Sequence, residues 1–124
     1  MKTPRRVYLK NKEIARGFVM ERIAHFNTVY QVVIKRVSIR NQKTRWGSCS
    51  KKGNLNFHHA IVQLPSPLAD LVIVHELCHL REFNHSKKFW DLVSQTIPNY
   101  KELKKSLRDN TINKIGRSNI FAGM

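Results

Sequence analysis

Two histidines and a glutamate in the middle of the chain have the types and spacing that hold a catalytic metal ion. His75, Glu76 and His79 form a His-Glu-x-x-His motif. Each residue of a helix advances by about 100°, so His75 and His79 project within roughly 40° of each other and can share a metal ion. Glu76 lies one step round, from where its carboxylate can reach a metal-bound water without binding the metal itself. The pattern therefore predicts a zinc hydrolase whose general base is Glu76.

A catalytic zinc site needs a third protein ligand, and the sequence offers two candidates. His85 follows His79 after five residues, but in a continuous helix it would point about 240° away, so the helix must end first. Asn84 tolerates a left-handed backbone, which would allow a reversal near Phe83. Glu82 would share the metal face if the helix continued instead. We favour His85; Glu82, or no third protein ligand, stays open.

Other residues near the motif have structural interpretations that we prefer. His58 and His59 lie on a predicted strand and could approach a metal, although strand histidines more often pack or line a surface. Cys78 is better explained as a small buried hydrophobe than as a ligand. Trp46, in the segment 45–50, is favoured as a core residue. The alternative is that this segment is a strand beside the metal, to which an extended peptide substrate could add.

The elements that must position these residues are a first helix and a small sheet. From about Asn11 to Tyr30, apolar residues recur with helical spacing; these are Ile14, Phe18, Ile23 and Phe26. Residues 31–41 alternate and are rich in β-branched side chains, which predicts a strand. Residues 45–50 and 55–62 flank a turn that contains Gly53, which predicts a β-hairpin. We therefore expect a small antiparallel sheet.

The metal-bearing helix should run from about Pro67 to His79. Ser66 is its expected N-cap, Pro67 its first residue, and Asp70 lies near its positive end. Residues 68–74 are almost wholly apolar, which predicts that this helix is buried in the core. Ser86 should cap a further helix that stops before Pro98, and a last basic helix is expected over residues 100–108. We assign residues 1–110 to one domain and residues 111–124 to a flexible basic tail.

Composition limits the partners and the compartment. The 124 residues include 23 Lys and Arg against 8 Asp and Glu, a formal net charge of +15. Such a charge attracts nucleic acids and nucleotides. Cys49 and Cys78 are too few for a disulfide framework. Since no apolar stretch approaches the length of a signal peptide or membrane span, we expect a cytoplasmic protein with no membrane contact.

Three linked motifs resemble those of the YgjP-like metallopeptidase family. They are the segments 42–50 (QKTRWGSCS) and 74–80 (VHELCHL), followed by Asn84-His85-Ser86 with Phe89-Trp90. The likeness extends from the first helix to about Arg108, and it suggests a relationship to the SprT and Wss1-type (WLM) zinc proteases. The resemblance implies a zincin-like α+β fold, in which a small sheet packs on the active-site helix among flanking helices. It also implies His75, His79 and His85 as ligands of one Zn²⁺ ion and a catalytic Glu76.

The leading hypothesis is a zinc metallopeptidase that hydrolyses peptide or protein substrates. Arg45, His59 and Tyr100 are candidate substrate-side or transition-state contacts. One alternative is a metal-dependent hydrolase of nucleotides or phosphate esters, although the sequence has no glycine loop that cradles phosphate. The other is a nucleic-acid-binding module with a structural metal, for which the basic surface would supply the affinity. The sequence leaves the oligomeric state open.

Overall fold

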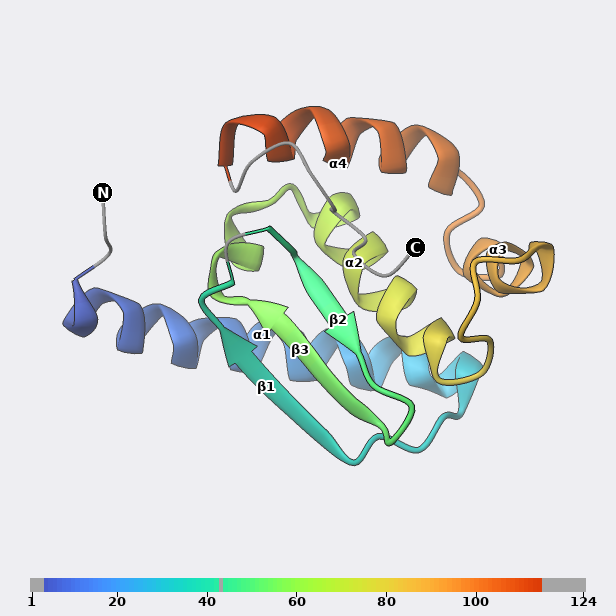
Figure 1. Cartoon of the computed structure of the whole chain (residues 1–124), viewed down its shortest axis with the longest axis horizontal. Helices are drawn as coiled ribbons and strands as arrows, with labels where there is room; N and C mark the ends of the chain where they lie inside the picture. Colours follow the sequence, from blue (N-terminus) through green and yellow to red (C-terminus); the bar gives the residue numbers. More distant parts are fainter. Residues whose placement is uncertain (1–3, 43, 115–124) are drawn as a thin grey trace.

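The computed structural model describes residues 4–42 and 44–114, which form four α-helices and a three-stranded sheet. In chain order the elements are α1 (Arg5–Tyr30), β1 (Arg36–Arg40), β2 (Gly47–Cys49), β3 (Asn54–His58), the 3₁₀-helix η1 (His59–Gln63), α2 (Ser66–His79), α3 (Lys87–Ser94) and α4 (Tyr100–Lys114). Figure 1 shows α1 passing behind the sheet, α2 beside β2, and α4 lying across α2. The α+β architecture is therefore confirmed, with α2 between the sheet and the later helices.

Helix α1 is longer than predicted, because it begins at Arg5 and not at Asn11. The 3.6-residue period sets which row of side chains is buried. That row consists of Ala15, Val19, Ile23, Phe26 and Tyr30. The burial expected for Ile23 and Phe26 is thus confirmed, whereas Ile14 is 52% exposed because it lies about 100° away from this row.

The sheet is mixed and not wholly antiparallel. The hairpin is confirmed, with β2 antiparallel to β3 and Gly53 in its turn at a φ of 96°. However, β1 pairs with β3 in parallel, so the strand order is β1-β3-β2. The central strand is the one that carries the fully buried Leu55 and Phe57. Residues 59–63 then leave the sheet as η1, and residues 31–35 precede the first strand, so both predicted strands were too long.

Helix α2 forms the buried centre of the molecule. It begins at Ser66, with Pro65 as N-cap and no side-chain capping bond, one residue earlier than expected. Every residue from Leu71 to His79 is buried, as the apolar sequence predicts. Asp70 does not act chiefly at the helix end. Its carboxylate accepts two hydrogen bonds from Arg22 of α1, at 2.9 and 3.0 Å, and so joins the two helices.

The last two helices cover α2. Ser86 occupies the predicted N-cap position of α3 but makes no side-chain capping bond, and α4 begins at Tyr100. Helix α4 continues to Lys114, so residues 111–114 of the expected tail are helical; residues 115–124 lie outside the described part of the chain. Within the described residues, the helices are too short or too polar to cross a lipid bilayer.

Candidate metal centre

The structure brings the imidazole rings of His75, His79 and His85 together. One nitrogen of each ring lies within 4.8 Å of the corresponding nitrogens of the other two. The Nε2 atoms of His75 and His85 are 3.0 Å apart. His75 and His79 are buried, whereas His85 is partly open to solvent. The three rings therefore converge on one point, with His85 as its most exposed member.

The third histidine joins the cluster because α2 ends at His79. Main-chain N–H groups of Arg81 and Glu82 donate to the carbonyl oxygen of Cys78, at 3.0 and 2.9 Å, which closes the last turn. The predicted reversal before His85 is confirmed, but not through a left-handed Asn84. Among the described residues other than glycine, only Gln31 has a positive φ. The turn is instead spread over residues 80–86, so a left-handed residue is not needed.

Phe89 of α3 packs against all three histidines. Its ring centroid lies 5.1 Å from that of His75, 4.5 Å from His79 and 4.9 Å from His85. The side chain is fully buried. Because packed side chains occupy well-defined rotamers, one apolar ring in contact with three imidazoles restricts all of them together. Helix α3 therefore positions the cluster although it contributes no histidine.

Two acceptors orient the buried histidines. Glu76 Oε2 lies 2.9 Å from His75 Nδ1, and the carbonyl oxygen of Glu82 lies 3.3 Å from His79 Nδ1. An Nδ1–H that donates to such an acceptor leaves the Nε2 lone pair facing the centre of the cluster. Glu82 therefore contributes its main chain, and its carboxylate is not part of the group of possible ligands.

Glu76 is a buried carboxylate with an unusual environment. Its residue is 2% exposed, and burial raises its pKa to about 7, although the nearby charges of His79 and Arg45 act to lower it. Gly47 of β2 lies directly against it: a Cβ atom at Gly47 would lie 3.1 Å from Glu76 Cγ. The glutamate is thus held between His75 and the backbone of β2, with a proton affinity suited to acid–base chemistry near neutral pH.

For the other candidate substrate contacts, the structure gives only indirect relations to the metal centre. Arg45 is exposed, and its charge acts on Glu76. Tyr100 stacks on Trp90 with ring centroids 5.0 Å apart, and Trp90 lies 6.0 Å from His85. His59 is stacked on His58 and lies edge-on to a tyrosine of α1, outside the group of possible ligands.

The remaining structural interpretations agree with the prediction. Trp46 is 1% exposed, which confirms that it packs in the core. Cys78 is fully buried and is not part of the group of possible ligands.

Two residues near the histidines were not assigned a role from the sequence. Glycine in a strand often marks a close approach by another group, and for Gly47 that signal could have identified its contact with Glu76. Lys104 of α4 has no such signal. Its ammonium group lies 4.2 Å from the ring centroid of Trp90. Burial is the main cause of the lowered pKa values of His75 and His85, and the charge of Lys104 lowers both further.

The donor set fits a zinc ion. With Zn–N distances of 2.0–2.1 Å, two ligands of a tetrahedral site are separated by about 3.4 Å, close to the 3.0 Å between His75 and His85. Burial lowers the pKa values of both histidines to about 3, which favours the neutral imidazole that binds metals. Three neutral histidines are the protein ligands of some catalytic zinc sites.

Comparisons with known proteins identify a family and two similar proteins. A family model described as "YgjP-like, metallopeptidase domain" matches residues 2–110. The chain is 26% identical over 102 residues to the UTP pyrophosphatase of Escherichia coli (strain K12), and the match covers 81% of this chain and 60% of that protein. It is also similar to the crystal structure of the metallopeptidase zymogen of Pyrococcus abyssi abylysin. That match has a TM-score of 0.66 and 26% identity, and it covers 81% of this chain and 97% of the other.

Proposed function

Because the chain belongs to the YgjP-like metallopeptidase family, we propose that it is a zinc-dependent hydrolase that cleaves peptide bonds. In this proposal His75, His79 and His85 hold one zinc ion and Glu76 is the general base. The observation that carries it is the convergence of three imidazoles beside a buried carboxylate. A metal-dependent hydrolase is supported both by the family and by the structural neighbour, whereas the peptide substrate is our inference.

Each residue has a defined task in this reaction. A zinc ion supplies Lewis-acid chemistry, since it makes water acidic near neutral pH and polarises a carbonyl oxygen. Glu76 takes a proton from the attacking water and returns it to the leaving amine. A carboxylate beside the attacking water can accept that proton and release it again.

Strand β2 is the proposed support for the substrate. It is an edge strand of the sheet, and its Gly47 lies against Glu76. An extended peptide could therefore pair with the outer edge of β2 and run past the histidines, using main-chain hydrogen bonds. This mode of binding would place the scissile bond beside the general base.

Hydrolysis of a nucleoside triphosphate is the second candidate. The Escherichia coli relative is named a UTP pyrophosphatase, which makes a nucleotide a reasonable substrate for this chain. The position of Lys104 supports it, because a positive charge that acts on His75 and His85 could also bind a phosphate group. Arginine or lysine beside a metal is a common way to neutralise phosphate in such reactions.

Replacement of Glu76 tests the shared chemistry. Glu76→Gln should retain zinc at one ion per chain, measured by elemental analysis, and lose turnover by at least about 100-fold. Unchanged turnover would refute the role of Glu76. If His85 is the third ligand, His85→Ala should lose zinc and Glu82→Ala should keep it. Loss of zinc only from Glu82→Ala would overturn the assignment of His85.

A Lys104 variant distinguishes between the two candidate reactions. Wild type and Lys104→Met would be assayed against unstructured casein and against UTP with the same zinc-loaded protein. The peptidase proposal expects casein cleavage that survives the Lys104 change. Hydrolysis of UTP alone, lost in Lys104→Met, would instead establish the nucleotide reaction.

A further inference from the structure

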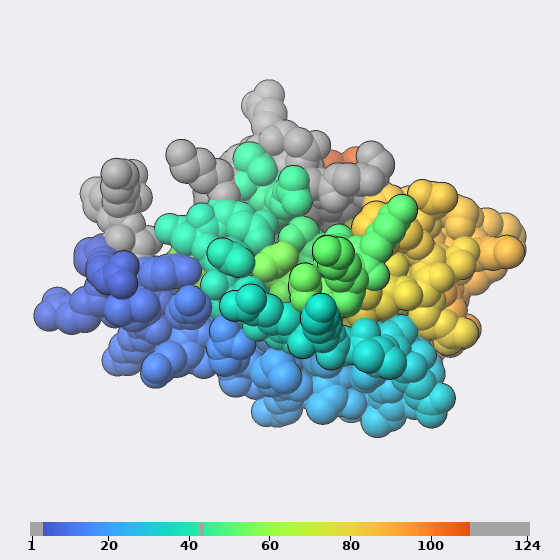
Figure 2. Space-filling view, turned by 60° about the horizontal axis from the view of Figure 1, so that its bottom comes forward, coloured from blue at the N-terminus to red at the C-terminus, as the bar shows by residue number. Residues whose placement is uncertain are grey.

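A strongly basic cavity lies away from the histidines, between the first half of α1 and strand β1. Its volume is about 320 Å³. It is lined by Tyr8, Lys12 and Arg16 of α1 and by Arg36, Ser38 and Arg40 of β1, among others. Figure 2 shows the first half of α1, in blue, beside the teal segment that contains β1 on one face of the molecule. The cavity therefore combines four cationic side chains from two elements.

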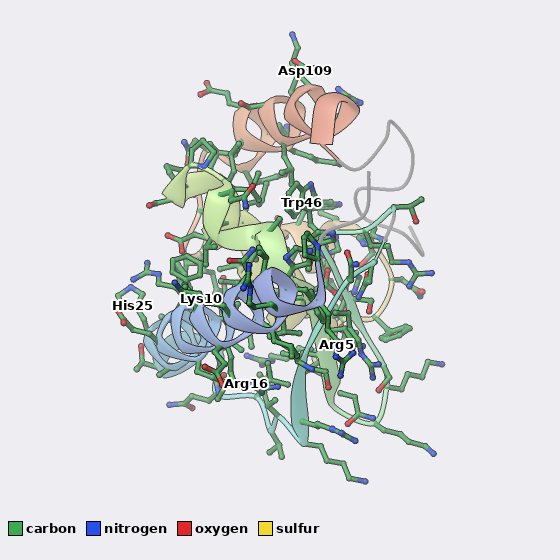
Figure 3. The ribbon with its side chains drawn as sticks, turned by 90° about the vertical axis from the view of Figure 1, so that its left-hand side faces the viewer. Arg5, Lys10, Arg16, His25, Trp46 and Asp109 are labelled. Carbon is green, nitrogen blue, oxygen red and sulfur yellow. The ribbon has the colours of Figure 1, made fainter. Side chains whose placement is uncertain are left out.

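The secondary structure groups these residues into two rows. Tyr8, Lys12 and Arg16 are spaced four residues apart, so they form one row along the helix. Arg36, Ser38 and Arg40 alternate along β1, so they share one face of the strand. The row on α1 and all five residues of β1, including Val37 and Ile39, line the cavity, and Arg36 and Arg40 lie on the face of the strand away from the buried Ile39. Figure 3 labels Arg5 and Lys10, two further cationic residues in the same half of α1.

The charges in the cavity are not neutralised by neighbouring acids. Among the described residues, no carboxylate lies within 4.0 Å of the four cationic groups, in contrast to Arg22, which is paired with Asp70. Arg16 Nη1 donates instead to the carbonyl oxygen of Val37 at 3.0 Å. Arg40 Nε donates to the neutral side chain of Asn56 at 3.4 Å. Neutral acceptors thus orient two of the guanidinium groups and leave their charge available.

We propose that this cavity binds the phosphodiester backbone of a nucleic-acid strand without regard to base sequence. Arg36 and Arg40 are separated by about 13 Å along the strand, which is longer than one phosphate group requires. Phosphates follow one another at about 3.4 Å along each strand of a duplex, so a row of this length meets several. Contacts of arginine and lysine with phosphate position a nucleic acid but carry no sequence information directly.

This inference is independent of the proposed hydrolysis. The cavity lies at the β1 edge of the sheet, whereas Glu76 lies against β2 at the other edge. A nucleic acid bound at β1 therefore leaves the histidines accessible. The chain would hold a nucleic acid with one edge of its sheet and act on a substrate at the other.

Binding would be measured by fluorescence anisotropy with labelled 20-nucleotide single- and double-stranded DNA, in the presence and absence of a chelator. Arg36→Gln/Arg40→Gln is compared with Lys101→Gln/Lys105→Gln, which removes the same charge from exposed positions on α4. The cavity variant should bind at least about tenfold more weakly than the control. The slope of log association constant against log salt concentration is negative. If each arginine contacts one phosphate, its magnitude should be smaller by about 1.4–1.8 for the cavity variant than for wild type. Melting curves would verify that both variants remain folded.

Three results would overturn the proposal. Equal losses in the two double variants would show that only net charge matters. Competition by inorganic phosphate as effective as that by DNA, at equal phosphate concentration, would indicate a site for a single phosphate group. Retention of DNA binding by the cavity variant, with loss of binding to phosphatidylserine vesicles, would identify a membrane surface instead.

Discussion

The contact between Gly47 and Glu76 predicts that a single added methyl group will disturb the general base. An alanine Cβ at position 47 would lie 3.1 Å from Glu76 Cγ, 3.2 Å from Glu76 Oε2 and 3.2 Å from Val72 Cγ1. These separations are shorter than ordinary van der Waals contact, and both Glu76 and Val72 are buried on α2. Something must therefore shift by a few tenths of an ångström. Overpacking of this kind costs about 1–3 kcal/mol of unfolding free energy.

The displacement caused by the added methyl group would affect the carboxylate of the proposed general base. Glu76 Oε2 is also the acceptor for His75 Nδ1, at 2.9 Å, so the carboxylate cannot move away without losing that bond. Misplacement of a catalytic group by 1 Å can cost about 100-fold in rate, so Gly47→Ala should lower turnover by about 10- to 100-fold. Zinc at saturating metal should stay at one ion per chain, because the new methyl meets no histidine.

Unfolding in urea, elemental analysis and turnover would be measured on the same samples. Gly17→Ala is a matched control, since a Cβ there meets no atom within 4 Å. It should stabilise α1 by about 0.5–1 kcal/mol. In a Glu76→Ala background, Gly47→Ala should cost less than it does alone, because two of the three close atoms are gone. A full cost in that background, or normal turnover of Gly47→Ala, would refute the reasoning.

Three further changes test the packing and the electrostatics. Phe89→Leu should weaken zinc affinity by about tenfold or more in a chelator competition, because Phe89 supports all three rings. Leu107→Ala, a fully buried control on α4, should lower stability but not affinity, and equal losses of affinity would contradict this role. Arg22→Gln should cost about 1–2 kcal/mol in urea unfolding, since the paired bonds to Asp70 are partly buried. Unchanged stability would show that the pair contributes little. For His58, burial and then the charge of His59 lower the folded-state pKa to about 4. The unfolded state therefore binds the proton first, and this residue removes about 1–2 kcal/mol of stability as the pH falls from 6.5 to 5. As the pH falls from 6.5 to 5, the unfolding free energy of metal-free His58→Gln should decrease less than that of metal-free wild type. Equal decreases would show that protonation of His58 does not destabilise the fold.

The elements that were predicted well are those with local signals. The all-apolar run and Pro67 identified α2, and the turn at Gly53 identified the hairpin. The parallel pairing of β1 with β3 had no local signal, because it joins residues 18 positions apart, as in the pair of Arg36 and Asn54. The strand order therefore depends on long-range pairing and could not be predicted from local sequence signals.

In the candidate site too, some features could be predicted from local sequence and others depend on tertiary packing. Helix periodicity alone placed His75 and His79 on one face, and it also required a helix end before His85. The turn that supplies this end did not use the left-handed residue that was expected, because several main-chain bonds share the reversal. Lys104 lies 19 residues after His85 and 29 after His75, so the effect of its charge on these histidines depends on the packing of α4.

The arrangement of the sheet gives its two edges different consequences for function. On β2, one strand provides both the backbone that fixes Glu76 and the free edge proposed for the substrate, so changes there should affect kcat and KM together. On β1, the cationic row lies beyond the central strand β3 and has no described contact with the histidines. Nucleic-acid affinity could therefore change through β1 without altering the geometry of catalysis. The separation follows from the strand order β1-β3-β2, because a sequential order would have put β2 in the centre and removed the free edge beside Glu76.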